Sequence, residues 1–243
     1  KYIKNEITKA CLEYMKINFS VYISTISDIP TSSGLGSSSA FTVGLLHALH
    51  TILGNKISKQ KLALQACKIE LDILKKPIGV QDQYAVSYGS INQINFRKKS
   101  IKVNKIKLNK NNLNLLSKQM FLVWTGQTRD SYRILRDQKK NIKKKTLQLN
   151  KMTSLANKFA KKIKMKKINL DVISDILNLN WTMKETLSKN ITTKKLLKIY
   201  NKIKKSKADG VKLLGAGGGG FFLTVVKKKN QEFFKKNIKS LKI

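Results

Sequence analysis

Residues 30–39, PTSSGLGSSS, place two glycines and three consecutive serines at the beginning of an expected helix. Apolar residues alternate along residues 19–24, as they do in a strand, and residues 40–53 have the apolar spacing of a helix. We therefore expect a strand, a glycine loop and a helix in that order. Glycine lets the backbone approach a ligand closely, and the free N–H groups of a first helical turn favour an anion. The stretch predicts a phosphate-binding loop.

Two common nucleotide-binding motifs do not fit this loop. A Walker P-loop needs a lysine after its last glycine, whereas Ser37 follows Gly36, and a dinucleotide fingerprint needs a third glycine. A second glycine cluster, residues 215–220 (GAGGGG), matches the dinucleotide spacing but leads into the β-like run 221–226 instead of a helix. Taken alone, this cluster is either a tight hairpin whose glycines allow close packing or a loop that faces a ligand.

The chain of 243 residues carries a formal net charge of +37, which in general suggests a nucleic acid or an anionic membrane surface as partner. Here the charge comes almost entirely from lysines spread over every segment, and the sequence has neither arginine clusters nor aromatic platforms. A drift of the whole composition explains this pattern more simply than a dedicated binding face does. We therefore expect no nucleic-acid partner.

The cysteine content and the hydropathy of the sequence indicate in which cellular compartment the protein is expected. Cys11 and Cys67 are too few for a disulfide framework or a zinc site, which would need about four ligands. No apolar run of the sequence approaches the roughly 20 residues of a membrane span. We expect a cytoplasmic protein with no membrane partner. His47 and His50, at i and i+3 of an expected helix, lack a third ligand nearby, so a helix surface is favoured over a metal site.

The pattern along the chain favours two halves. The polar residues 109–114 are the expected boundary, so we predict domains at residues 1–110 and 111–243. Outside the two glycine loops, the expected elements are helices at residues 2–15, 58–74 and 231–239, several helices between 130 and 205, a hairpin formed by 90–96 and 101–108, and strands at 120–124, 211–214 and 221–226.

Two acidic residues near the first glycine loop are candidates for chemistry. Asp82 stands between two amides in residues 79–84 (GVQDQY), before an expected apolar strand, where it could orient a substrate hydroxyl or accept its proton. An ordinary turn aspartate is the alternative. Glu70, on the preceding helix, could bind a magnesium ion that bridges nucleotide phosphates, because this ion prefers oxygen ligands. A solvent-facing helix glutamate is the alternative there.

These segments, taken together, resemble motifs of the GHMP small-molecule kinases, which include galactokinase, homoserine kinase, mevalonate kinase and phosphomevalonate kinase. Residues 30–38 resemble the second motif, residues 79–83 the catalytic-aspartate segment and residues 212–220 the third motif, in matching order over nearly the whole chain. Residues 81–84 and 125–135 look most like the D-glycero-D-manno-heptose 7-phosphate kinase branch, with fucokinase-like sugar kinases close by.

The resemblance implies an α+β fold of two domains, with the active site in the cleft between them. It implies an ATP-dependent sugar kinase that uses Mg²⁺, with Asp82 as the catalytic carboxylate and Ser38 and Glu70 as the metal site. General-base help from such a carboxylate is typically worth about 10² to 10⁴ in rate. The residues expected to hold ATP are Pro30, Ser33, Gly34, Leu35, Gly36, Ser37, Ser38 and Ser39.

The expected substrate is a small-molecule sugar or sugar phosphate, most specifically the anomeric hydroxyl of the heptose 7-phosphate. Arg129 is the candidate for the sugar or its distal phosphate, because guanidinium binds phosphate bidentately. A surface arginine paired with Asp130 or Asp137 is the alternative. The substrate-binding residues expected from the resemblance are Gln83, Thr125, Arg129, Gly217 and Gly218.

Other functions remain open at this point. They are a different GHMP sugar kinase of the fucokinase or galactokinase kind, a lysine-rich nucleic-acid-binding protein, and a catalytically inactive homologue kept for interaction. A homodimer is also left open. The family's first motif, a strand-borne segment with proline and arginine, does not precede Lys1. We therefore expect this chain to lack the first strands of the fold.

Overall fold

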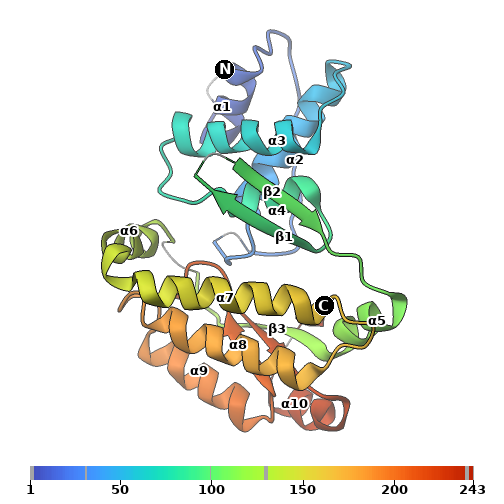
Figure 1. The fold of residues 1–243 in the computed structure, drawn as a ribbon. Coiled ribbons are helices and arrows are strands. Elements are labelled where there is room, and N and C mark those ends of the chain that lie inside the picture. The colour runs from blue at the N-terminus through green and yellow to red at the C-terminus, as the bar shows by residue number, and fades with distance from the viewer. Residues whose placement is uncertain (1–2, 31, 99, 129–130, 239–240, 243) are drawn as a thin grey trace. The chain divides into compact units, whose positions relative to one another are not determined.

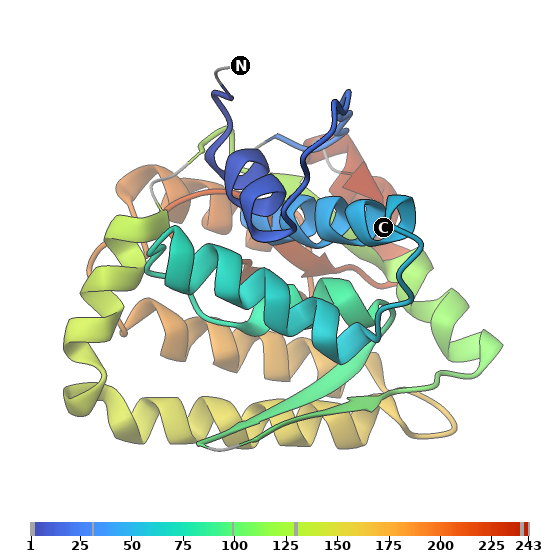
Figure 2. The same cartoon turned by 90° about the horizontal axis from the view of Figure 1, so that it is seen from above.

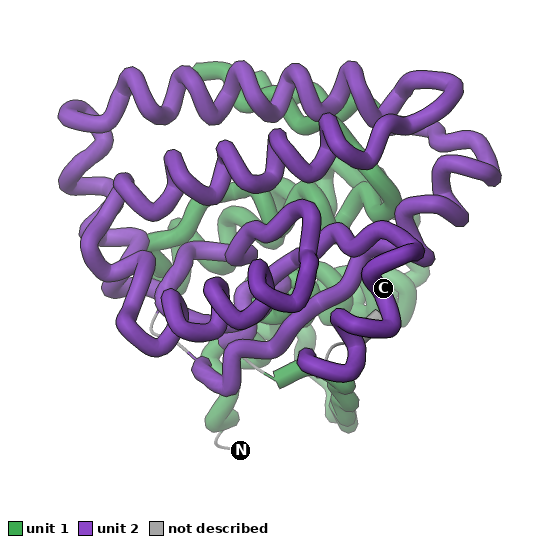
Figure 3. The backbone as a smooth tube through the Cα atoms, turned by 90° about the horizontal axis from the view of Figure 1, so that it is seen from below, with its two compact units in different colours: residues 1–31, 36–105 green, residues 32–35, 106–243 purple. Residues whose placement is uncertain are grey.

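The structure is a computed structural model that describes residues 3–30, 32–98, 100–128, 131–238 and 241–242. It divides into two compact units (Figure 3), and the expectation of an α+β fold is confirmed. Unit 1 comprises residues 1–31 and 36–105, and unit 2 comprises residues 32–35 and 106–243. The predicted boundary after residue 110 falls inside a helix of unit 2, and the two-domain division at that point stays a prediction.

Unit 1 is a helical layer with one hairpin (Figure 1). Its core consists of apolar side chains that recur on one face of each helix, among them the fully buried Cys11, Leu46, Ala66 and Ile69. The expected helices at 40–53 and 58–74 are confirmed, and the one expected at 2–15 is confirmed over Glu6–Tyr14. The helical elements are α1 (Glu6–Tyr14), α2 (Ser37–Ile52), α3 (Lys59–Cys67), the π-helical segment η1 (Lys68–Ile73) and α4 (Gln81–Tyr88).

The expected hairpin is confirmed. β1 (Asn92–Arg97) pairs antiparallel with β2 (Ser100–Lys105), with Ile94 opposite Val103. Tyr84 of α4 packs its ring edge-to-face on Phe96 of β1, at 6.4 Å between ring centroids. This contact packs the middle of α4 on the hairpin.

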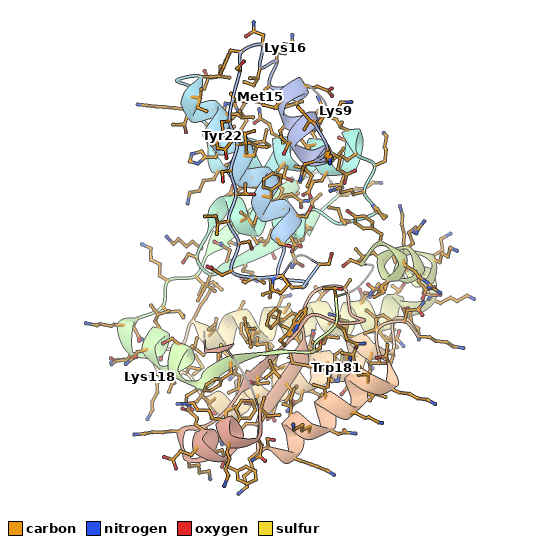
Figure 4. The ribbon with its side chains drawn as sticks, turned by 180° about the vertical axis from the view of Figure 1, so that it is seen from behind. Lys9, Met15, Lys16, Tyr22, Lys118 and Trp181 are labelled. Carbon is orange, nitrogen blue, oxygen red and sulfur yellow. The ribbon has the colours of Figure 1, made fainter. Side chains whose placement is uncertain are left out.

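The strand expected at residues 19–24 is wrong. The alternation that suggested it is real, since Val21 and Ile23 are half-buried and Tyr22 between them is 95% exposed (Figure 4). Ile23 also packs against the core of unit 1. A strand, however, is defined by hydrogen bonds to a neighbour, and β1 and β2 pair only with each other within the described residues. The segment is therefore extended but unpaired there.

Unit 2 is built on an antiparallel sheet of order β4-β5-β3-β6. Leu213 of β4 pairs with Phe222 of β5, and Phe222 pairs in turn with Val123 of β3. The expected strands at 120–124, 211–214 and 221–226 are confirmed, because each has the short apolar pattern of a buried strand. The strands are β3 (Met120–Trp124), β4 (Gly210–Leu213), β5 (Phe221–Val225) and β6 (Leu241–Lys242).

Helices cover the sheet of unit 2, and α7, α8 and α9 run side by side (Figures 1 and 2). Trp181 of α8 is 2% exposed and meets the ring of Phe222 edge-on, at 5.9 Å between centroids (Figure 4). The helical elements are α5 (Lys110–Gln119), α6 (Ser131–Asn141), α7 (Thr146–Ile163), α8 (Leu170–Glu185), α9 (Lys194–Lys205), α10 (Gln231–Asn237) and the 3₁₀ turns η2 (Lys143–Lys145) and η3 (Lys228–Asn230).

The polar residues 109–114, expected as a linker, instead begin α5. The side chain of Asn109 accepts a hydrogen bond from the amide of Asn112 at 2.8 Å, which is the role of an N-cap residue. A polar run can thus start a helix as well as end one. Among the described residues, none of the helices has the length and apolar character needed to cross a membrane.

Candidate active site

The first glycine loop ends at the N-terminus of α2. Gly36 is the N-cap residue with φ 74°, and Gly34 before it has φ 84°, so both occupy the left-handed region that glycine adopts without strain. The first backbone bond of α2 runs from the amide of Ala40 to the carbonyl of Gly36 at 2.8 Å. The amides of residues 37–39 therefore precede the intrahelical bonds, which is the arrangement that attracts an anion.

The other predicted ATP-binding residues differ in exposure. Pro30 and Ser38 are exposed, whereas Ser39 is buried. Ser33 is fully buried, and its Oγ has no hydrogen-bond partner among the described residues. The half-buried members are Gly34, Leu35, Gly36 and Ser37.

Glu70 is the side chain on which the contacts of unit 1 converge. It lies in the π-helical segment η1 and is fully buried, so the solvent-facing alternative does not hold. Its Oε1 accepts a hydrogen bond from Ser38 Oγ at 2.5 Å, and its Oε2 accepts from Ser39 Oγ at 2.8 Å and from Gln83 Nε2 at 2.6 Å. π-Helical turns are rare and frequently lie at functional sites. No sequence signal pointed to this one.

Asp82 lies in the first turn of α4, and the apolar strand expected after it is wrong. Tyr84 is 2% exposed and stacks on Tyr88 one turn later, so the apolar residues follow a helical period. Asp82 is in contact with Gly36, because a Cβ placed on Gly36 would lie 3.4 Å from Asp82 Cγ and 3.5 Å from its Oδ2. The structure thus brings the candidate carboxylate to the N-terminus of α2.

The donor set around Glu70 fits a magnesium ion. Ser38 Oγ and Glu70 Oε1 lie 2.5 Å apart, so both oxygens can reach one cation, and Mg²⁺ is usually held by one or two protein oxygens together with water and phosphate. Within the described ranges, His, Cys, Asp and Glu form no cluster of three that could hold a metal without such outside ligands. The helix-surface expectation is wrong for His50, which is buried with its Nε2 2.8 Å from Gln65 Oε1, whereas His47 is exposed.

Gln83 was predicted to bind substrate, and its side chain is fully buried against Glu70 instead of being exposed. It follows Asp82 directly in α4. The contact therefore ties the start of α4, and with it the candidate carboxylate, to the residue that also binds Ser38 and Ser39. Sequence reasoning missed this link, since the pattern of the chain gives no sign of which residue a buried amide meets.

Both cysteines lie beside this cluster, and their surroundings favour the neutral thiol. Burial, with the charge of Glu70 adding to it, raises the pKa of the Cys11 thiol to about 12. Burial likewise raises the pKa of Cys67 to about 11, again with the charge of Glu70 adding to it. Both thiols are free.

In unit 2, the second glycine cluster is the turn between β4 and β5 and is tightly packed. A Cβ on Gly217 would lie 2.9 Å from Ile191 Cγ2, and one on Gly218 would lie 2.5 Å from Ile134 Cδ1. The amide of Gly218 donates to the carbonyl of Ile191 at 2.8 Å. The glycines therefore serve close packing, whereas their contact with a substrate stays a prediction.

Thr125 is brought to the same turn. Its Oγ1 donates to the carbonyl of Gly220 at 2.7 Å, and the residue is 3% exposed.

Arg129 and Asp130 lie outside the described residues, so the predicted role of Arg129 stays a prediction. Asp137 accepts hydrogen bonds from the side chains of Ser188 and Asn190.

The first part of the chain matches the model of a known protein family. Residues 2–90 match the model of the GHMP kinases N terminal domain. This part of the chain is a GHMP kinase N-terminal domain. It holds the first glycine loop, Glu70 and Asp82, so the cluster described above lies within the GHMP domain.

Similar proteins extend the likeness beyond the GHMP domain. The chain is 29% identical over 222 residues to a D-glycero-alpha-D-manno-heptose 7-phosphate kinase of Campylobacter jejuni, covering 89% of this chain and 63% of that protein. It is 38% identical over 69 residues to a galactokinase of Pyrococcus furiosus, covering 28% of this chain and 20% of that protein. The chain thus spans less than two thirds of the length of either relative.

A solved structure shows the same fold. A D-glycero-D-manno-heptose 1-phosphate kinase from Bacteroides thetaiotaomicron superposes with a TM-score of 0.72 at 19% identity, covering 100% of this chain and 72% of that one. At this identity the likeness concerns the fold alone. The likeness in fold to that structure therefore extends over the whole chain.

Proposed function

We propose that this protein is an ATP-dependent sugar kinase, which transfers the γ-phosphate to a sugar hydroxyl, most specifically the anomeric hydroxyl of D-glycero-D-manno-heptose 7-phosphate. The observation that carries the proposal is the cluster in the GHMP domain, where Ser38, Ser39 and Gln83 bind Glu70 and Asp82 contacts Gly36. The Campylobacter jejuni relative, at 29% identity, supports the choice of the heptose.

The glycine loop is the proposed binding site for the phosphates of ATP. The amides of residues 37–39 donate to phosphate oxygens, and the glycines allow the backbone to approach them. Ser38 and Glu70 would hold Mg²⁺, which neutralises the charge on the phosphates during transfer. Ser39 and Gln83 hold the Glu70 carboxylate in place through Oε2, which leaves Oε1 toward Ser38.

Asp82 is the proposed catalytic carboxylate. In this role it accepts the proton of the sugar hydroxyl while the hydroxyl oxygen forms the new bond to phosphorus and the bond from phosphorus to ADP breaks. Its contact with Gly36 keeps it next to the amides proposed to hold the phosphates.

The proposal is tested on protein expressed from its natural coding sequence. ADP release is measured with Mg²⁺-ATP and a panel of acceptors: heptose 7-phosphate, galactose, fucose, mannose and mevalonate. The product is then identified by mass spectrometry and phosphorus NMR. We expect turnover on heptose 7-phosphate to exceed turnover on the other acceptors by at least tenfold, with the new phosphate on the anomeric oxygen.

A second acceptor class has support of its own. The galactokinase of Pyrococcus furiosus is 38% identical over the shared 69 residues. Preferred turnover of galactose would therefore reject the heptose and keep the sugar kinase. If no acceptor of the panel is phosphorylated, the proposed kinase activity toward these acceptors is rejected.

A further inference from the structure

A lysine lies buried beneath the turn of residues 215–220. Lys184, in the last turn of α8, is only 7% exposed, although most lysines of this chain are on its surface. Burial of an ammonium group is costly unless its N–H groups find acceptors. The position of Lys184 therefore indicates a specific use of its charge.

Lys184 binds the backbone where β4 enters the turn. Its Nζ donates to the carbonyl of Leu213 at 3.0 Å and also to the carbonyl of Gly215. Gln138 of α6 donates from Nε2 to the next carbonyl, that of Ala216, at 3.0 Å. Two helices thus hold the carbonyls of three residues at the start of the turn.

We call the contacts of Lys184 and Gln138 with these carbonyls the clamp. The geometry of the peptide bond means that the clamp also fixes the direction of the neighbouring amides. The C=O and N–H of one trans peptide point in opposite directions, and the described residues contain no cis peptide. Because the carbonyls of Gly215 and Ala216 point to Lys184 and Gln138, the amides of Ala216 and Gly217 point away from them. Within the described part of the chain, neither amide has a hydrogen-bond acceptor.

Two successive amides without acceptors are donors that suit an anionic oxygen. Gly217 is buried, so an amide left without any partner there would be destabilising. We propose that the amides of Ala216 and Gly217 bind an anionic oxygen of the sugar-phosphate acceptor, and that Lys184 is the positioning residue that directs them. The assignment of the acceptor rests on the proposed function, whereas the clamp itself does not.

The chain contains a matched control for Lys184. Lys204 of α9 also donates to two backbone carbonyls, those of Ala208 at 3.3 Å and Asp209 at 3.4 Å. These carbonyls precede β4, whereas those held by Lys184 follow it or end it. Lys184→Met and Lys204→Met therefore remove the same kind of contact at opposite ends of one strand.

Steady-state kinetics and hydrogen exchange test the proposal. In Lys184→Met we expect the KM for the acceptor to rise about tenfold or more, with the KM for ATP changed less than twofold. Lys184→Arg, which keeps a charged donor, should recover most of the loss. Lys204→Met should leave both KM values unchanged. A general loss of stability would not separate the two substrates in this way.

Hydrogen exchange gives a readout that needs no activity. The amide of Gly218 is protected by the carbonyl of Ile191, so it should exchange about tenfold faster in Lys184→Met and at the wild-type rate in Lys204→Met. If Lys184→Met fails to fold, Gln138→Leu, which removes only the Ala216 contact, should shift both readouts in the same direction by less.

The outcomes separate the two proposals. If Lys184→Met keeps wild-type turnover, the wild-type KM for the acceptor and the wild-type exchange rate of the Gly218 amide, the role of Lys184 is overturned. The proposal of a sugar kinase then still stands. Faster exchange with an unchanged acceptor KM would overturn the amide site while keeping the clamp. If the wild type has no turnover on the panel, the proposed function fails, and the exchange of Gly218 alone decides whether Lys184 holds the turn.

Discussion

At the scale of single residues, the backbone conformation of Gly36 requires glycine. Its φ of 74° lies in the left-handed region, whereas a Cβ there would meet Asp82 Cγ at 3.4 Å, an ordinary van der Waals distance. We expect Gly36→Ala to destabilise the protein by about 1–2 kcal/mol, since a non-glycine residue in that region costs roughly this amount. The measurement is urea denaturation followed by circular dichroism.

Gly44 provides the control for this prediction. It lies within α2, is exposed, and a Cβ added to it meets nothing within 4 Å. Gly44→Ala should therefore stabilise the protein by about 0.5–1 kcal/mol through helix propensity. Equal effects of the two alanines would show that the left-handed conformation of Gly36 does not require glycine.

Glu70 tests the metal site at the same scale. Glu70→Gln keeps the size of the side chain and removes its charge, so binding of a non-hydrolysable ATP analogue with Mg²⁺ should weaken at least tenfold. Binding of the same analogue without Mg²⁺ should change little. Isothermal titration calorimetry measures both.

Glu13→Gln, on the exposed surface of α1, is the charge-matched control. It should leave the effect of Mg²⁺ on binding unchanged. If Glu70→Gln also leaves that effect unchanged, Glu70 is no magnesium ligand and its buried contacts serve only the fold.

At the scale of elements, α1 and α3 bring two neutral thiols to the Glu70 cluster. The pKa values of Cys11 and Cys67 are raised to about 12 and 11, so the folded protein holds these protons more tightly than the unfolded chain does. Their contribution to stability is therefore complete below pH about 9 and is lost as the pH rises through the folded pKa values.

Alkylation by iodoacetamide at pH 8.5 checks this prediction, because only the thiolate reacts. Both cysteines should react at least tenfold more slowly in the native protein than in urea. Mass spectrometry resolves the two sites. Native and unfolded rates that agree within a factor of two would contradict the burial and the pKa directions of both thiols.

The elements also show what the sequence could and could not predict. The strands that flank the second glycine cluster were predictable, because a short apolar run specifies a buried strand locally. Residues 19–24 have the alternation of a strand but no partner among the described residues, and pairing is not a local property. The π-helical turn at Glu70 and the burial of Gln83 depend on packing between helices, which no local pattern reports.

In the candidate site, too, some features could be predicted from the sequence and others could not. The resemblance to the GHMP kinases predicted that the first glycine loop and Asp82 belong together, and the contact of Asp82 with Gly36 agrees. Lys184 could not be predicted, since it is one lysine among many in the sequence. Its distinctive feature is burial, which appears only when α8 packs on β4.

At the scale of the whole molecule, the two units have different proposed tasks. The GHMP domain in unit 1 holds the cluster of Glu70, Ser38 and Asp82, and unit 2 holds the clamped turn of residues 215–220. The predicted shared cleft stays a prediction. The net charge of +37 comes from lysines in both units, which agrees with a bias of composition.

The most direct test of the kinase proposal is the rate of ADP release by Asp82→Asn with Mg²⁺-ATP and the best acceptor of the panel. Asp72→Asn, an exposed aspartate of η1, is the matched control and should keep wild-type turnover. We expect Asp82→Asn to lose about 10² to 10⁴ in kcat while its affinity for the ATP analogue changes less than threefold. Wild-type turnover by Asp82→Asn would contradict the account.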